Sequence, residues 1–164
     1  MSKIKAKAAA IINARAEDVY TTLADYRHGH PKILPPKNLY DLQVEQGGYG
    51  AGTIIRFKSR LLGVEQSFRQ RVSEPEPGHI LIERDIDTVQ DECSTFTVTP
   101  VEQGQKTHFE ILTTVNPDPG LKGLIERIVV PLFLSPVLRD EIQRMEKVAQ
   151  QRGSASLTAS GQSL

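Results

Sequence analysis

The stretch PGLKGLIERIVVPLFLSPVLRDEIQRMEKVAQQR, residues 119–152, decides the fold. Its apolar residues recur at steps of three and four, which is the spacing of one face of an α-helix. Asp118 offers an N-cap oxygen, Pro119 suits the first helical position, and Gly153 follows the last turn. At about 1.5 Å per residue the helix would be roughly 50 Å long. We therefore expect it to lie across a whole β-sheet.

Two prolines, Pro131 and Pro136, lie inside this helix. Each lacks a backbone N–H and crowds a carbonyl one turn earlier, so we expect a bend between them. Ser135 before Pro136 is also typical of a new helix start, so two helices in line are the alternative. Because the apolar face resumes after the prolines, one kinked helix is favoured.

The composition limits the classes of function. The 164 residues include 20 basic and 20 acidic side chains, so no net charge would attract the protein to nucleic acid. Cys93 is the single cysteine, which excludes an internal disulfide and fits a reducing cytoplasm. A membrane-spanning helix needs about 18 apolar residues in a row, and no apolar run in this sequence is that long. The apolar run at residues 8–12 is also shorter than the core of a signal peptide, which has about seven to fifteen residues. We therefore expect a cytoplasmic protein without a transmembrane segment.

The rest of the chain predicts an antiparallel sheet and a short helix. Residues 4–12 are a predicted strand, and apolar residues from Ala16 to Leu23 have the spacing of a helix that ends at about residue 26. Residues 28–38 contain three prolines, which predicts a loop with at most one helical turn. Six more segments alternate apolar and polar residues and are predicted strands: residues 39–45, 53–60, 64–72, 79–85, 93–99 and 106–115. Residues 1–152 should form one domain, and the small polar residues of 153–164 an unstructured tail.

Several stretches together are similar to a known family. They are INARAEDVYTTLADY (12–26), HPKILPP (30–36), GGYGAGT (47–53), VSEPEPGHILIERD (72–85), TFTVTP (95–100) and GLIERIVVPLFLSPVLRDEIQRMEKVA (123–149). Over roughly residues 4–151 the chain resembles the polyketide cyclase/dehydrase-like proteins of the START and Bet v 1-like (SRPBCC) superfamily. The resemblance implies an α+β helix-grip fold, in which a curved antiparallel sheet wraps around the C-terminal helix and leaves a hydrophobic cavity. Arg15 departs from the pattern, because many relatives have a better N-capping residue there.

Two features of the sequence agree with a cavity. The chain has no tryptophan, four tyrosines and five phenylalanines, which is little side-chain volume to fill the space under one long helix. Gln66 and Gln70 share a strand face with Phe68, and buried amides need the partners that water or a ligand would supply. The alternative is that this face is solvated. The residues predicted to line the cavity and bind the ligand are Tyr26, Ile55, Phe57, Gln66, Phe68, Gln70, Phe96, Ile111, Leu124 and Ile128.

No local motif predicts a cofactor or metal site. The glycines at positions 48, 50 and 52 precede a strand, whereas a dinucleotide-binding loop precedes a helix. His28 and His30 have no second cluster of ligands to complete a metal site.

Catalytic groups are equally sparse in the sequence. Asp25, Tyr26 and His30 are weak candidates for an acid or a base at the mouth of the cavity. Glu65 and Glu83 are interpreted as members of charge pairs on the outer face of the sheet.

Two functions from different classes remain. The first is binding of a small hydrophobic ligand, such as a lipid, an isoprenoid or an aromatic polyketide, in the internal cavity. The second is a polyketide aromatase/cyclase-type enzyme that uses the same cavity, which would need an inward acid or base with a perturbed pKa. Since few such groups are evident, binding is favoured. Peripheral membrane contact through the loop from His28 to Asn38 is a third interpretation, if Ile33 and Leu34 are exposed there. The sequence does not choose between a monomer and a dimer.

Overall fold

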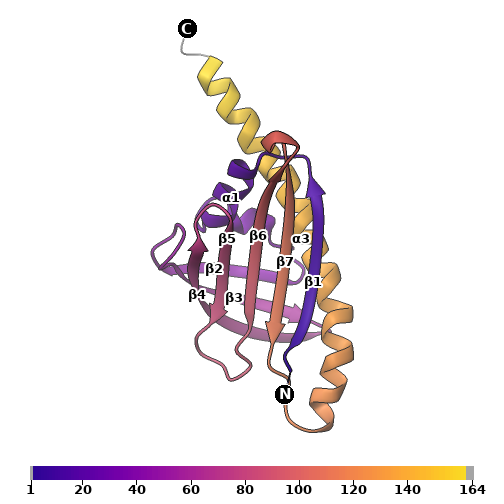
Figure 1. Ribbon diagram of the computed structural model, residues 1–164. Coiled ribbons are helices and arrows are strands. Elements are labelled where there is room, and N and C mark those ends of the chain that lie inside the picture. The colour runs from indigo at the N-terminus through magenta and orange to yellow at the C-terminus, as the bar shows by residue number, and fades with distance from the viewer. Residues whose placement is uncertain (1, 162–164) are drawn as a thin grey trace.

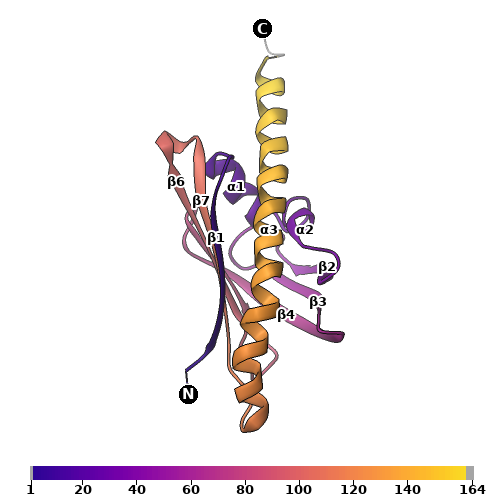
Figure 2. The same ribbon diagram turned by 90° about the vertical axis from the view of Figure 1, so that its right-hand side faces the viewer.

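A single curved sheet grips one long helix. The computed structural model describes residues 2–161, with seven antiparallel strands in the order β1-β7-β6-β5-β4-β3-β2. Figures 1 and 2 show the sheet curving around helix α3, with β1, β6 and β7 on one side of the helix and β2, β3 and β4 on the other. The predicted α+β helix-grip fold is confirmed.

The elements follow the predicted order. The strands are β1 (Ile4–Ile12), β2 (Leu39–Gln46), β3 (Ile54–Leu61), β4 (Val64–Glu76), β5 (Ile80–Asp85), β6 (Cys93–Val101) and β7 (Lys106–Val115). The helices are α1 (Ala16–Ala24), α2 (His30–Ile33) and α3 (Leu121–Gly161), with a short 3₁₀ turn, η1 (Glu102–Gly104), between β6 and β7. Each strand from β2 to β7 pairs with the next one along the chain, and β1 pairs with β7 at one edge of the sheet.

The alternating strand residues form the core on the side of the sheet that faces α3. On β4, Phe68, Gln70 and Val72 are buried while Arg71 between them is exposed. Phe57 of β3 pairs in register with Phe68, and their rings stack with centroids 5.5 Å apart. The alternative in which this face is solvated is therefore wrong, although Gln66, nearer the start of β4, is exposed.

The loop before β2 folds inward. Its one helical turn, α2, buries His30 and Ile33. Gly29 allows this close approach, because a Cβ there would lie 2.4 Å from the backbone oxygen of Thr22. The premise of the membrane-contact interpretation is therefore wrong for Ile33, which has no exposed surface. Arg15, at the start of α1, makes no side-chain capping hydrogen bond.

Helix α3 is continuous and longer than predicted. Both Pro131 and Pro136 lie within it, so the two-helix alternative is wrong. It begins at Leu121 rather than Pro119, because Gly120 adopts a left-handed backbone with φ of 76°. It ends at Gly161, so residues 153–161 are helical and the predicted unstructured tail is wrong there, while residues 162–164 lie outside the described part. Within residues 2–161, no helix combines the length and apolar character of a membrane span.

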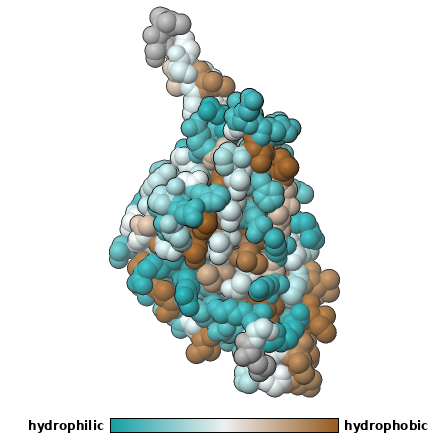
Figure 3. Space-filling view, viewed as in Figure 1, coloured by the Kyte–Doolittle hydropathy of each residue, from teal (hydrophilic) through white to brown (hydrophobic). Residues whose placement is uncertain are grey.

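The first half of α3 exposes its apolar face. Leu124 and Ile128 retain 62% and 71% of their accessible surface, whereas Leu138 and Ile142 are buried. Figure 3 shows the exposed face as a brown region at the lower right, where the first turns of the helix lie.

Candidate functional site

A cavity lies between the sheet and α3. Its volume is about 60 Å³, small beside the about 300–1,000 Å³ of ligand pockets that enclose drug-sized molecules. The apolar lining residues are Leu34, Leu39, Leu42, Ile55, Phe57, Phe96, Ile111, Leu134 and Leu138. The polar lining residues are His30, Ser59, Gln70, Glu83, Glu92, Ser94, Thr113 and Glu141. Several of the leucines are only partly buried, so the cavity meets solvent on their side.

Half of the residues predicted to line the cavity do so. The structure places Ile55, Phe57, Gln70, Phe96 and Ile111 in the wall. Tyr26 is fully buried behind the wall, and Gln66 and Phe68 line a separate surface groove near the β5–β6 loop. That any of these residues binds a ligand stays a prediction.

The prediction that Leu124 and Ile128 line the cavity is wrong. They lie on an apolar stripe of α3 whose side chains are exposed to solvent. Leu134 and Leu138, further along the helix, supply the helical side of the cavity wall instead.

Two of the three catalytic candidates meet at a buried carboxyl group. The Tyr26 hydroxyl donates to Glu83 Oε1 at 2.6 Å, and His30 Nε2 lies 3.3 Å from the same oxygen. The Tyr26 and His30 rings stack with centroids 4.5 Å apart. Burial raises the pKa of Tyr26 well above its ordinary value, and the charge of Glu83 adds to the rise. The tyrosine is therefore a hydrogen-bond donor and not a base at neutral pH.

Asp25 does not join this cluster. Its carboxylate accepts hydrogen bonds from the backbone N–H groups of Arg27 and His28, and it faces Arg152 at 3.5 Å. It stabilises the turn between α1 and α2, so its candidate catalytic role has no support in its contacts.

The prediction that Glu83 lies on the outer face of the sheet is wrong. Only 6% of its surface is exposed. A signal was present, because alternation along β5 places Leu81, Glu83 and Asp85 on one face, and an inward leucine implies an inward glutamate.

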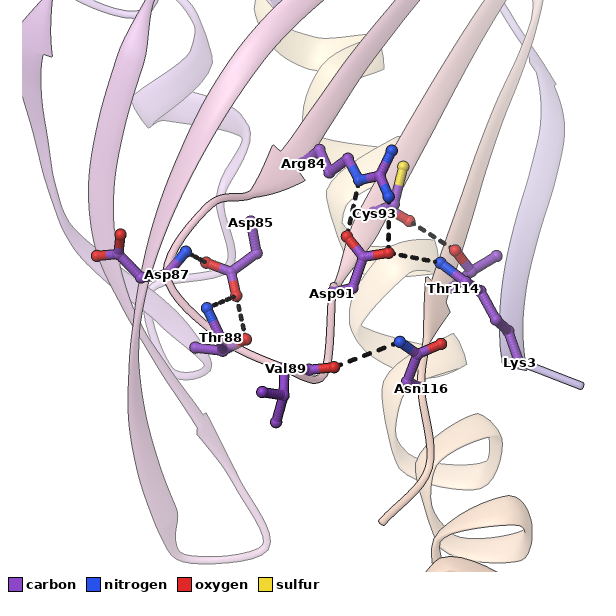
Figure 4. Close-up of polar contacts among 10 residues, drawn as sticks. All are labelled: Lys3, Arg84, Asp85, Asp87, Thr88, Val89, Asp91, Cys93, Thr114 and Asn116. Atoms are coloured by element: carbon purple, nitrogen blue, oxygen red, sulfur yellow. Dashed lines mark hydrogen bonds and ion pairs between the residues drawn. The ribbon is translucent and has the colours of Figure 1, made fainter. Parts of the chain in front are cut away.

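The β5–β6 loop positions a second carboxyl group at the cavity. Asp91 accepts two hydrogen bonds from Arg84, at 2.7 and 2.8 Å, and one from Lys3 at 2.9 Å (Figure 4). These bonds, above all those from Arg84, lower the pKa of Asp91 to about 2. The next residue, Glu92, lines the cavity, and its backbone oxygen accepts from Asp85 N–H at 2.8 Å. Anchoring Asp91 on the outside thus holds Glu92 toward the inside.

The protonation of Glu92 responds to pH near neutrality. Burial raises its pKa to about 7, with further contributions from Asp85 and Glu83. Gln70 donates to Glu92 Oε1 at 3.4 Å, which opposes the rise.

The third carboxyl group comes from α3. Glu141 is 3% exposed and lines the cavity. Within residues 2–161, its Oε1 and the Oε1 of Gln70 are buried oxygens without a hydrogen-bond partner. Burial, with smaller effects of Glu83 and Asp140, raises the pKa of Glu141 well above its ordinary value. Spacing offered a signal here too, since Glu141 lies three residues after Leu138 and four before Met145 on the buried stripe.

Three lining residues, Gln70, Glu92 and Glu141, bring polar oxygen atoms to this largely apolar cavity, and we call these three residues together the acidic end. Such groups can accept hydrogen bonds, hold a positive charge or transfer a proton. In the described part of the chain, no cluster of three or more His, Cys, Asp or Glu residues has a geometry that could hold a metal ion.

Comparison with known proteins agrees with this fold. The family model described as "Polyketide cyclase / dehydrase and lipid transport" matches residues 3–150. No curated protein matches the chain. The NMR structure of KanY protein superposes with a TM-score of 0.78 at 26% identity, over 92% of this chain and 99% of that one.

Two further solved structures show the shared fold. The Zhui aromatase/cyclase from Streptomyces sp. R1128 has a TM-score of 0.75 at 15% identity, over 92% of this chain and 96% of that one. A START superfamily protein from Mycobacterium smegmatis has a TM-score of 0.69 at 15% identity, over 92% and 99% of the two chains.

Proposed function

The chain belongs to the polyketide cyclase/dehydrase and lipid transport family, and on this premise we propose that it binds a small, largely apolar molecule in the cavity between the sheet and α3. The observation that carries the proposal is the apolar lining of the cavity. Apolar side chains reach the same space from the sheet, from the segment after α2 and from α3. Burying apolar ligand surface there would contribute about 25 cal/mol per Å².

The size of the cavity constrains the ligand. A volume of about 60 Å³ is smaller than the roughly 150 Å³ of an engineered apolar cavity that binds benzene. The ligand is therefore small, or its remaining length lies between the partly buried leucines on the open side. Leu34 and Leu134 are such residues, and they come from the segment after α2 and from α3.

An aromatase/cyclase-type activity is the second candidate function. It is favoured by one observation, the cluster of Tyr26, His30 and Glu83 beside the cavity. Ring closure of a poly-ketone needs a base that removes a proton from the carbon between two carbonyls, and an acid that protonates the carbonyl oxygen under attack. Loss of water then removes that hydroxyl together with a proton from the neighbouring carbon. The Glu83 carboxylate, which lines the cavity beside His30, would supply the base, and Glu141, whose pKa is raised by burial, would supply the acid.

Blocking the cavity tests the binding proposal. The dye N-phenyl-1-naphthylamine is neutral, apolar and larger than the cavity, so part of it would lie between the partly buried leucines on the open side. We expect Leu134→Trp to fill this space and weaken dye binding by roughly ten-fold or more, which corresponds to about 1.4 kcal/mol. Leu132→Trp is the matched control, because Leu132 is exposed on the same helix two residues away. Fluorescence titration gives both affinities, and circular dichroism confirms folding. Equal affinities of the two variants would show that the dye binds elsewhere and would contradict the proposal.

Native mass spectrometry of the freshly purified protein, followed by solvent extraction, identifies a natural ligand. A defined co-purifying molecule with an apolar body supports binding as the function. Turnover of a poly-ketone substrate that is lost in Tyr26→Phe or Glu141→Gln would instead favour the enzyme.

A further inference from the structure

The cavity wall has an unusual balance of charge. Among the described residues that line it, three are glutamates and none is a lysine or an arginine. His30 is the one side chain in the wall that can become positively charged near neutral pH. An apolar ligand alone would not need this arrangement, since buried carboxyl groups without partners destabilise the fold.

The histidine neutralises only one of the three glutamates. His30 Nδ1 lies 2.8 Å from the Leu23 carbonyl oxygen, so Nδ1–H must donate there. The contact between Nε2 and Glu83 is then favourable only if a proton lies between them. Whichever group holds this proton, the pair has no net charge. Glu83 also accepts from Tyr26, so its needs are met within the protein.

The acidic end, by contrast, includes buried oxygen atoms that have no hydrogen-bond donor in the described residues. Glu141 Oε1 and Gln70 Oε1 are buried and unpartnered within residues 2–161, although both residues line the cavity. Glu92 receives one long hydrogen bond, from Gln70. The acceptors come from β4, from the β5–β6 loop and from α3, so they approach the cavity from the sheet and from the helix.

From this geometry we propose that the acidic end binds a protonated primary amine, so that the ligand has an ammonium group joined to an apolar tail. The inference rests on the proposed binding function and names the class of ligand. An ammonium group has three N–H donors and no acceptor, as in lysine, and the cavity lining offers acceptor oxygens from Gln70, Glu92 and Glu141. A carboxylate ligand would add a negative charge beside Glu92 and Glu141, and an alcohol has a single donor and no charge.

Proton release should accompany amine binding. Burial raises the pKa of Glu92 to about 7, so part of the empty protein holds a proton on Glu92 near neutral pH, and burial raises the pKa of Glu141 as well. An ammonium group favours the ionised carboxylates and would expel these protons. The titratable groups around them are His30 on α2, Glu83 and Asp85 on β5, Tyr26 after α1 and Asp140 on α3. Amine affinity should therefore rise from pH 5 to pH 8 and fall as the amine deprotonates near pH 10 or above.

The test compares three probes with the same tail: hexylamine, 1-hexanol and hexanoate. NMR titration of the ¹⁵N-labelled protein at pH 7.5 should show that hexylamine binds roughly ten-fold or more tightly than 1-hexanol, and that hexanoate binds least. Glu141→Gln should weaken hexylamine by roughly ten-fold and leave 1-hexanol within about two-fold, a difference of about 1.4 kcal/mol. Asp140→Asn is the matched control, since Asp140 is the neighbouring carboxylate, is partly exposed and pairs with Arg144.

Calorimetry of the unmodified protein gives a readout that does not depend on a variant. In buffers of different ionisation enthalpy at pH 6.5, hexylamine binding should release protons and 1-hexanol binding should release none. If 1-hexanol binds as tightly as hexylamine, or if no proton is released with the amine, the inference is overturned while the binding function stands. If none of the three probes binds and the dye also fails to bind, the binding function fails with it.

Discussion

The two halves of α3 have the same apolar spacing and opposite environments. Residues 121–133 place Leu124, Ile128 and their neighbours on one stripe, and residues 137–149 place Leu138, Ile142 and Met145 on a second stripe, which is rotated by roughly a quarter turn about the helix axis. The first group is exposed and the second is buried. A helical period therefore predicts which residues share a face, but it does not predict whether another part of the protein covers that face.

The contacts of each half explain the difference. Helix α3 packs on β1, α1 and α2. In its second half Gln150 donates to the Asn13 backbone oxygen at 2.8 Å, while Glu146 accepts from Asn13 N–H at the same distance. The first half is connected by polar contacts, such as the bond of 2.8 Å from Arg127 to the Ser2 backbone oxygen. Figure 1 shows these first turns at the end of the molecule, beyond most of the sheet.

The largest expected effect is a difference in protein stability between substitutions in the two halves of α3. Ile142→Ala removes a buried side chain, and we expect it to lower the free energy of unfolding by about 2–5 kcal/mol. Ile128→Ala is the matched control and should change it by less than about 0.5 kcal/mol, because Ile128 is already in water. Urea denaturation followed by circular dichroism measures both. Comparable losses would mean that the first half is covered in solution, and the contrast would disappear.

Other parts of the fold could be predicted from the sequence because they depend on local sequence patterns. The period of two along β3 and β4 predicted their inward faces, and the residues on either side of each turn predicted the hairpins. The error at Leu124 and Ile128 has a different cause. The stripe of Leu124 and Ile128 points away from the face that α3 buries, which includes Gly123 in the same turn. Which side of a helix meets the sheet depends on the tertiary packing and leaves no local pattern in the sequence.

The site could be predicted only in part from the sequence, because its charged residues interrupt the apolar patterns of the strands and helices. Glu83 and Glu141 each stand on an apolar face of a strand or helix, and the usual interpretation puts charged residues outside. The buried residues on the same faces, Leu81, Leu138 and Met145, indicate instead that both glutamates point inward. Glu92 gave none, because its inward direction depends on Arg84 and Lys3 binding the adjacent Asp91.

A smaller effect should appear within the buried half. Replacing Glu141 with methionine keeps the length of the side chain and removes a buried carboxyl group whose Oε1 lacks a partner in the described residues. We expect Glu141→Met to raise the free energy of unfolding by about 1–3 kcal/mol at pH 8 and to reduce amine binding.

The pH dependence of this gain has a defined sign. The pKa of Glu141 is raised in the folded protein, so folding retains a proton that the unfolded chain loses above pH 4.5. The stability of the unmodified protein should therefore be highest relative to Glu141→Met below pH 4.5 and should decline as the pH rises. Urea denaturation of both proteins at pH 4, 6 and 8 measures the trend. A gain that is independent of pH would show that the carboxyl group is solvated.

The smallest effect should occur in the exposed half. Leu124→Glu places a charge on the apolar face and exchanges one good helix former for another. Because 62% of Leu124 is exposed, we expect the free energy of unfolding to change by less than about 0.5 kcal/mol. Sedimentation velocity should give the same mass for both proteins if the face is bare in solution. A lower mass for the variant would show that this face joins copies of the chain, and the difference between the two halves would then lie in what covers each of them.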